Sequence, residues 1–207
     1  MADSLTPDPA LGLIELDSIA IGVLTGDAMV KAAPIDAVHA GTVHPGRYLV
    51  LVSGDTASVE IALAVGRVTA GPAVIDAVFL ADIHPDVTAA IVSDEETARP
   101  TGEAVAVIET ATVACAIDAA DAAVKTSAVD VSALRLADGL GGKAYLVLGG
   151  ELAEVEAAVE RALERVGEHR SEVRSVVVAQ LSDEMRHNLA SDLRFGARVG
   201  ASPQGDR

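Results

Sequence analysis

Short apolar runs alternate with longer stretches in which apolar residues recur at helical spacing. The run Leu11–Leu16 predicts a strand, and the apolar positions that follow from Ile19 predict a helix that ends before Pro34. Two further strands are expected at 35–43 and 48–52, because Pro45 and Gly46 between them are turn-forming residues. The chain therefore begins with a strand, a helix and a pair of neighbouring strands.

A second helix and a fourth strand complete this set. Asp55 is placed to accept hydrogen bonds from first-turn amides, and the apolar spacing continues to Gly71. A strand is expected at 73–80 and a short helix at 86–92. The order strand, helix, strand, strand, helix, strand is typical of a ferredoxin-like α+β layer within the broad α/β class, in which helices cover one face of a sheet.

The same order of segments then returns. Glu15 and Lys31 recur as Glu109 and Lys125, each 94 residues later (109 − 15 = 125 − 31 = 94). The corresponding segments of the second copy are 104–110, 113–126, 129–138, 143–149, 151–166, 173–180 and 183–193. Two copies of one domain are therefore fused in tandem.

One loop differs in length between the copies. Gly46-Arg47 corresponds to Gly142-Lys143 with a separation of 96 residues (142 − 46 = 96), so the second copy has two extra residues just before this turn. A duplication with one altered loop suggests a ring whose walls alternate.

The domain boundaries follow from composition. An N-terminal tail at 1–10 precedes a first domain at 11–93, and residues 94–103 combine charge, proline and glycine without an apolar period, as a linker does. The second domain is expected at 104–195 and a disordered tail at 196–207.

The composition favours an oligomer. Hydrophobic residues make up 50% of the 207 residues, but Trp is absent and Phe and Tyr number two each, so the cores must be built from Ala, Val, Leu and Ile. The mean hydropathy of +0.38 without a long apolar run indicates that apolar surface is buried between subunits as well as within them.

Charge and cysteine usage narrow the classes of partner. The formal charge of −16 repels phosphate backbones and anionic lipids, so neither nucleic acid nor a membrane is an expected partner. The first ten residues lack the basic start and apolar segment of a leader, which predicts a cytosolic protein. The single cysteine, Cys115, lies in an Ala-rich helical stretch and is expected to be a buried small apolar residue.

The repeated motifs resemble those of a known family. Ile-Glu, then Asp-Ala-x-x-Lys, then Pro-Gly-Arg or Gly-Gly-Lys before an apolar strand occur in both halves, and the resemblance spans about 11–193. The sequence resembles bacterial microcompartment shell proteins of the tandem-domain branch. The resemblance implies a homotrimer that forms a flat pseudohexagonal tile with a central pore for metabolites. It also implies a place in the microcompartment shell, in the cytoplasm, with other shell proteins and encapsulated enzymes as partners.

The resemblance also assigns roles to single residues. The loops before Arg47 and Lys143 match the pore-lining loops of the family, and Lys31 and Lys125 match a lysine that such proteins place at tile edges. The implied pore-lining residues are His44, Pro45, Gly139, Leu140 and Gly141.

His44 raises the question of a metal. Some relatives carry Cys at this position, where three copies hold an iron–sulfur cluster, but the residue here is His, so no such cluster and no cofactor is expected. Three His44 imidazoles meeting at the pore would be able to bind a divalent metal or to give the pore a pH-dependent charge. A pore-wall histidine without a ligand is the preferred interpretation.

The sequence offers no set of catalytic residues. The five histidines share no motif, and the glycines at 139–142 are followed by a strand and not by the Lys-Ser/Thr and helix of a phosphate loop. We therefore expect a protein that is not an enzyme. The alternative is a ferredoxin-like regulatory protein that binds a small molecule and remains a discrete oligomer.

Overall fold

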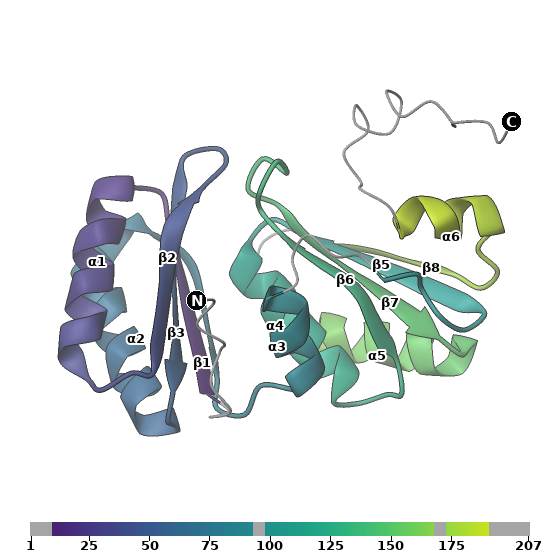
Figure 1. Ribbon diagram of the computed structural model, residues 1–207, viewed down its shortest axis with the longest axis horizontal. Helices are drawn as coiled ribbons and strands as arrows, with labels where there is room; N and C mark the ends of the chain where they lie inside the picture. The colour runs from purple at the N-terminus through teal and green to yellow at the C-terminus, as the bar shows by residue number, and fades with distance from the viewer. Residues whose placement is uncertain (1–9, 93–97, 168–172, 191–207) are drawn as a thin grey trace, which may run out of the picture.

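The computed structural model describes residues 10–92, 98–167 and 173–190. Residues 1–9 of the tail predicted at 1–10, the tail predicted at 196–207 and residues 94–97 of the predicted linker lie outside the described residues, while Ala10 belongs to the first strand. Two four-stranded sheets are each packed against two helices, and the second domain lies beside the open face of the first sheet (Figure 1). No helix in the described ranges is long and apolar enough to cross a membrane.

The two halves contain the same series of elements. The first half consists of β1 (Ala10–Leu16), α1 (Ile19–Ala32), β2 (Ala37–Val43), β3 (Arg47–Gly54), α2 (Thr56–Ala70), the 3₁₀ turn η1 (Gly71–Ala73), β4 (Val74–Leu80) and α3 (Pro85–Val92). The second half consists of β5 (Ala104–Thr110), α4 (Val113–Val124), β6 (Asp130–Leu136), β7 (Ala144–Gly150), α5 (Leu152–Val166), β8 (Val173–Val178) and α6 (Asp183–Leu189).

Both sheets have the ferredoxin-like strand order. The orders are β2-β3-β1-β4 and β6-β7-β5-β8, and all pairs are antiparallel. The predicted α+β layers are thereby confirmed. The expected boundaries were less accurate: β3 begins at Arg47 and runs to Gly54, because these residues continue the pairing with β1 and β2.

Side-chain caps explain where the helices begin. Ser18 accepts from the Ile21 N–H at the start of α1, and Thr112 accepts from the Cys115 N–H at the start of α4. Asp55 accepts from the Ser58 N–H at the start of α2, as predicted. Cys115 is fully buried in α4, which confirms its expected place in the core.

Helix α4 packs against both sheets. It packs with α5 on its own sheet and also contacts β1 and β4 of the first domain, so it lies between the two sheets (Figure 1). One core cluster therefore contains Leu13 and Val78 of the first sheet together with Ala116 and Ile117 of α4. The many alanines of α4 allow this close approach, so one apolar cluster is shared by the two domains, while a separate cluster under α1 and α2 belongs to the first domain.

The strand registers locate the differences between the copies. Val43 pairs with Arg47 across a loop of three residues, 44–46, whereas the equivalent loop spans five residues, 138–142. This confirms the two extra residues of the second copy. A second difference was not predicted: the register shifts between Val131 and Ala133, so Ser132 is an additional bulged residue in β6.

Candidate functional site

The β2–β3 and β6–β7 loops lie next to each other at one end of the molecule (Figure 1). His44 and Pro45 are exposed in the first loop, and Gly139 and Gly141 are exposed in the second, with Leu140 half-buried. The structure thus brings together the residues for which sequence predicted a common pore. Their role as pore-lining residues remains a prediction.

Arg47 joins the base of one loop to the other domain. Its Nη1 donates to Glu15 Oε1 at 2.6 Å and to the carbonyl oxygens of Ala111 and Gly142, each at 3.1 Å. One guanidinium therefore contacts its own sheet, the segment before α4 and the β6–β7 loop. Sequence reasoning missed this network, although a glutamate inside the apolar strand β1 was a signal for it.

The Glu15 carboxylate also connects the two domains. It is fully buried, and its Oε2 accepts from the Val113 N–H at 2.9 Å, at the N-terminus of α4. Burial raises the pKa of Glu15 above its ordinary value; the hydrogen bonds from Arg47 and Val113 act in the opposite direction, and Asp76 adds to the increase. The Glu15 carboxylate is thus held by groups from both domains.

Gly142 is required by this arrangement. Its φ is +86°, and a Cβ at this position would lie 2.8 Å from Cζ of Arg47. Gly139 and Gly141 also have positive φ, but a Cβ on either would meet nothing within 4 Å. Of these three loop glycines, Gly142 is the one at which both the backbone conformation and the close approach of a side chain select glycine.

The other end of α4 contacts the first domain through polar groups. Asp121 accepts from the His84 N–H at 2.8 Å and forms an ion pair with Lys125 Nζ at 2.8 Å, and Lys125 also donates to the Asp82 carbonyl. Lys31, the equivalent lysine, pairs with Asp27 and its side chain is 73% exposed. The expected role of both lysines at tile edges remains a prediction.

The repeated positions have opposite environments in the two copies. Lys143 pairs with Glu109 at 3.0 Å in the place where Arg47 pairs with Glu15, but the Lys143 and Glu109 side chains are 55% and 42% exposed. Glu109 therefore lies at a surface that no second domain covers in the single chain.

The apolar side chains around these pairs differ in the same way. Val113 and Ile117 of α4 are fully buried, whereas their equivalents in α1, Ile19 and Val23, are 45% and 56% exposed. Val78 on the open face of the first sheet is 2% exposed, and its equivalent in the second sheet, Val176, is 51% exposed. The chain thus contains one complete interface and, at its two ends, the two halves of another.

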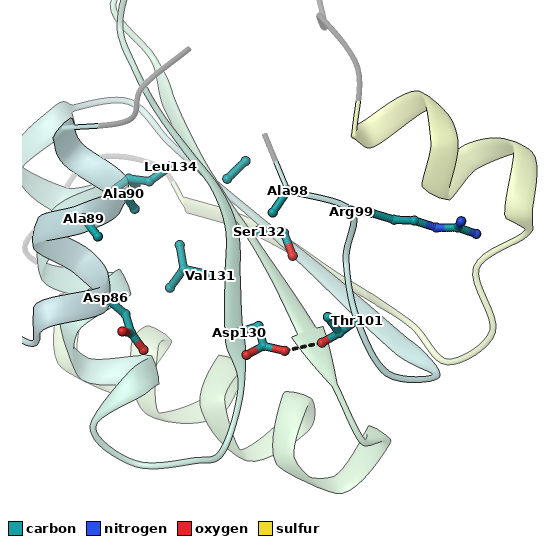
Figure 2. A pocket seen from close by; sticks show the side chains of 11 residues that line it. Asp86, Ala89, Ala90, Ala98, Arg99, Thr101, Asp130, Val131, Ser132 and Leu134 are labelled. Carbon is teal, nitrogen blue, oxygen red and sulfur yellow. Dashed lines mark hydrogen bonds between the residues drawn. The ribbon is translucent and has the colours of Figure 1, made fainter. Parts of the chain in front are cut away.

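A cavity of about 540 Å³ lies between α3, the segment 98–101 and β6 (Figure 2). Asp130 in its wall accepts a hydrogen bond from Thr101, and Arg99 forms an ion pair with Asp183 at 2.9 Å. The Ser132 hydroxyl is buried and has no partner in the described part of the chain. These side chains do not include a nucleophile paired with a base.

Metal ligands are not grouped in the single chain. Over residues 10–92, 98–167 and 173–190, no three His, Cys, Asp or Glu side chains lie close enough together to hold a metal ion. A site formed by His44 would need three chains, so the single chain does not test it.

Comparisons with known proteins agree on one family. The BMC domain matches residues 10–83 and 104–181. The chain is 38% identical over 149 residues to the bacterial microcompartment shell protein PduT of Citrobacter freundii, covering 72% of this chain and 80% of PduT. It is also 39% identical over 61 residues to the shell protein EutK of Salmonella typhimurium, 30% of this chain and 37% of EutK.

Solved structures show the same likeness. A microcompartment protein from Desulfitobacterium hafniense DCB superposes with a TM-score of 0.71 and 36% identity, covering 86% of this chain and 98% of that protein. The fused permuted hexameric shell protein MSM0275 from the RMM microcompartment has a TM-score of 0.55 and 21% identity, covering 75% of this chain and 80% of that protein, and supports the fold alone.

Proposed function

Because the chain belongs to the BMC-domain family, we propose that it is a structural component of a bacterial microcompartment shell, located in the bacterial cytoplasm. Its partners are then other shell proteins and the enzymes enclosed by the shell. The relatives are named as shell proteins, which supports a structural and not a catalytic role. The small-molecule-binding alternative is not favoured by them.

The interface inside the chain supports a specific assembly. Helix α4 covers the open face of the first sheet, while α1 and the open face of the second sheet each expose apolar residues at the matching positions. If α1 of one copy covers the second sheet of the next, every interface in the assembly is of one kind. A head-to-tail contact of this type forms a ring when its rotation closes. Three chains supply six domains, which gives the proposed homotrimeric pseudohexagonal tile.

The polar groups at the boundary between the two domains support the same contact. Glu15 accepts from the Val113 N–H within the chain, so the equivalent Glu109 is placed to accept from the Ile19 N–H of the neighbouring copy. Lys143, in the position of Arg47, would then face the carbonyl oxygens that precede the neighbour's α1. This contact would cover Glu109 and Lys143, which are exposed in the single chain.

The two loops then alternate around the axis of the ring. His44 and Pro45 from one domain and Gly139, Leu140 and Gly141 from the other are proposed to line a central pore through which metabolites pass between the cytosol and the enclosed enzymes. Their position at one end of the molecule supports this arrangement (Figure 1). We propose no iron–sulfur cluster, because an imidazole at His44 replaces the thiolate that such clusters use.

Lys31 and Lys125 are proposed to contribute to contacts between tiles. The exposure of Lys31 supports this role most directly. Lys125 already donates a hydrogen bond to the Asp82 carbonyl of the first domain. It would therefore contribute both to the contact between the two domains and to the contacts between tiles.

Native mass spectrometry tests the ring. The wild-type protein is expected to consist of three chains of 21.0 kDa each. Val23→Glu places a charge on the exposed face of α1 and is expected to give a folded monomer. Ala153→Glu adds the same charge on α5, away from the proposed contact, and should leave the trimer intact. A wild-type monomer or dimer, or a trimer that survives Val23→Glu, would overturn this assembly.

A further inference from the structure

Helix α2 has an apolar stripe on its outer side as well as on its inner side. Its inner side, which packs against α1 and the first sheet, is buried through Val59, Ala62, Leu63 and Gly66. Its outer side exposes Ala57, Ile61, Ala64 and Val68, and of these Ile61 is 50% and Val68 84% exposed. An exposed stripe of this length on a chain of charge −16 indicates a contact surface.

The proposed ring leaves this stripe uncovered. The contacts between the two domains involve α3, α4, β1, β4 and β6, whereas the principal contacts of α2 are with α1, η1 and the strands of its own sheet. Since the contact between chains is proposed to repeat the contact within the chain, α2 takes no part in it either. The inference below rests on the proposed ring in this one respect.

The equivalent helix of the second domain shows that the fold does not need the stripe. The residues of α5 at the same positions are Ala153, Ala157, Glu160 and Glu164. Two glutamates thus stand where α2 has Ala64 and Val68. The apolar outer face is specific to the first domain, and a charged one is compatible with the same helix.

The stripe is complementary to itself. Its residues are spaced by four, three and four positions, which is the a/d seam of a helix pair. When two copies of α2 run antiparallel about a two-fold axis, Ile61 faces Ala64 of the other copy and Val68 faces its Ala57. Each large side chain then packs against a small one.

The charges beside the stripe fit the same pairing. Glu60 and Arg67 lie seven residues apart on the same flank of the stripe, and both are exposed. One Arg67 nitrogen, Nη2, donates to the Ala77 carbonyl at 3.2 Å, and the other N–H groups of the guanidinium remain for a carboxylate. In the antiparallel pair, Glu60 of one copy lies opposite Arg67 of the other, on both sides of the axis. We propose that α2 pairs with α2 of a second copy of this chain, so that two rings are joined through their first domains and not through α5.

Removal of the stripe tests this pairing. Ala64→Glu with Val68→Glu gives α2 the two residues that α5 carries, so the fold should tolerate both changes. Native mass spectrometry at increasing concentration is expected to show six-chain species for the wild type and only three-chain species for this variant. Ala153→Glu with Ala157→Glu adds two charges to α5 and should leave the six-chain species unchanged.

The outcomes separate this inference from the ring itself. Wild-type rings that remain three-chain species at high concentration, or six-chain species that persist in the Ala64→Glu, Val68→Glu variant, would overturn the α2 pairing. Monomers at all concentrations would instead overturn the ring.

Cross-linking and charge exchange test the register. Ile61→Cys with Ala64→Cys is expected to give a covalent two-chain product on mild oxidation, whereas wild type gives none because Cys115 is buried. Glu60→Arg should weaken the pairing about two- to fivefold, the range of an exposed ion pair, and adding Arg67→Glu should restore it. Absence of the cross-link, or no restoration, would contradict the antiparallel register.

Discussion

Helices α1 and α4 are copies of one element, but only α4 has a second sheet against its outer face. Val113 and Ile117 are fully buried there, while Ile19 and Val23 are 45% and 56% exposed. The exposed copy has kept its large apolar side chains at the positions that are buried in α4. The outer face of α1 therefore has the composition of an interface and not of a solvated surface.

The ion pairs beside these helices show the same contrast. Glu15 is fully buried, and Arg47 binds it and two carbonyl oxygens of the other domain, whereas Glu109 and Lys143 form one pair in contact with water. A buried pair and an exposed pair at equivalent positions differ greatly in what is lost when one partner is removed.

The largest expected effect comes from breaking the buried pair. Arg47→Ala leaves the Glu15 carboxylate buried without its cation and is expected to lower the free energy of unfolding by about 3–5 kcal/mol. Lys143→Ala removes the equivalent cation from an exposed pair and should cost less than about 1 kcal/mol in a single chain. Urea unfolding at a fixed protein concentration, on a Val23→Glu background, measures both. If Arg47→Ala and Lys143→Ala lowered the free energy of unfolding equally, the predicted difference between the buried and the exposed pair would be wrong.

A smaller effect on stability is expected when equivalent apolar side chains of α4 and α1 are truncated. Ile117→Ala removes a buried side chain from the shared core and is expected to lower the free energy of unfolding by about 2–4 kcal/mol. Val23→Ala at the equivalent exposed position should change the stability of the chain by less than about 0.5 kcal/mol. The same truncation should weaken the trimer, which dilution followed by native mass spectrometry would detect. If Val23→Ala left the trimer as stable as the wild type, the proposed role of α1 would be wrong.

Sequence alone predicted the parts of the fold that depend on local pattern. The order of elements, the duplication and the longer second loop were read correctly, because apolar spacing and repeated motifs are properties of neighbouring residues. The bulge at Ser132 was missed, because the connection before β6 is one residue shorter than the connection before β2. The two changes cancel, so equivalent residues are 94 positions apart both at Lys31 and Lys125 and after the bulge.

The contacts across the seam were not predictable in the same way. Arg47 was identified only as part of the repeated motif that precedes an apolar strand, and its contacts with Ala111 and Gly142 join positions that are 64 and 95 residues away. The outer stripe of α2 was also missed, because a helix with apolar residues on two sides does not show in sequence which side its own sheet covers. Both features depend on tertiary packing and not on local pattern.

The smallest expected effect concerns pH. Burial raises the pKa of Glu15, so the folded chain holds this proton more tightly than the unfolded chain, whose carboxyl titrates near 4.5. The contribution of Glu15 to stability is therefore complete below that pH and is lost as the pH rises through the folded pKa. Relative to Glu15→Gln, the wild type should lose about 1.4 kcal/mol for each unit by which the pKa is raised.

Urea unfolding of the wild type and of Glu15→Gln between about pH 4 and 7 measures this difference. Glu109→Gln is the matched control for loss of the carboxylate at the repeated position. A stability difference between wild type and Glu15→Gln that grows in favour of the wild type as the pH rises would mean that Arg47 and the Val113 N–H outweigh burial. The first domain would then hold a charged Glu15 carboxylate between the two domains, and closing the ring would be expected to do the same to Glu109.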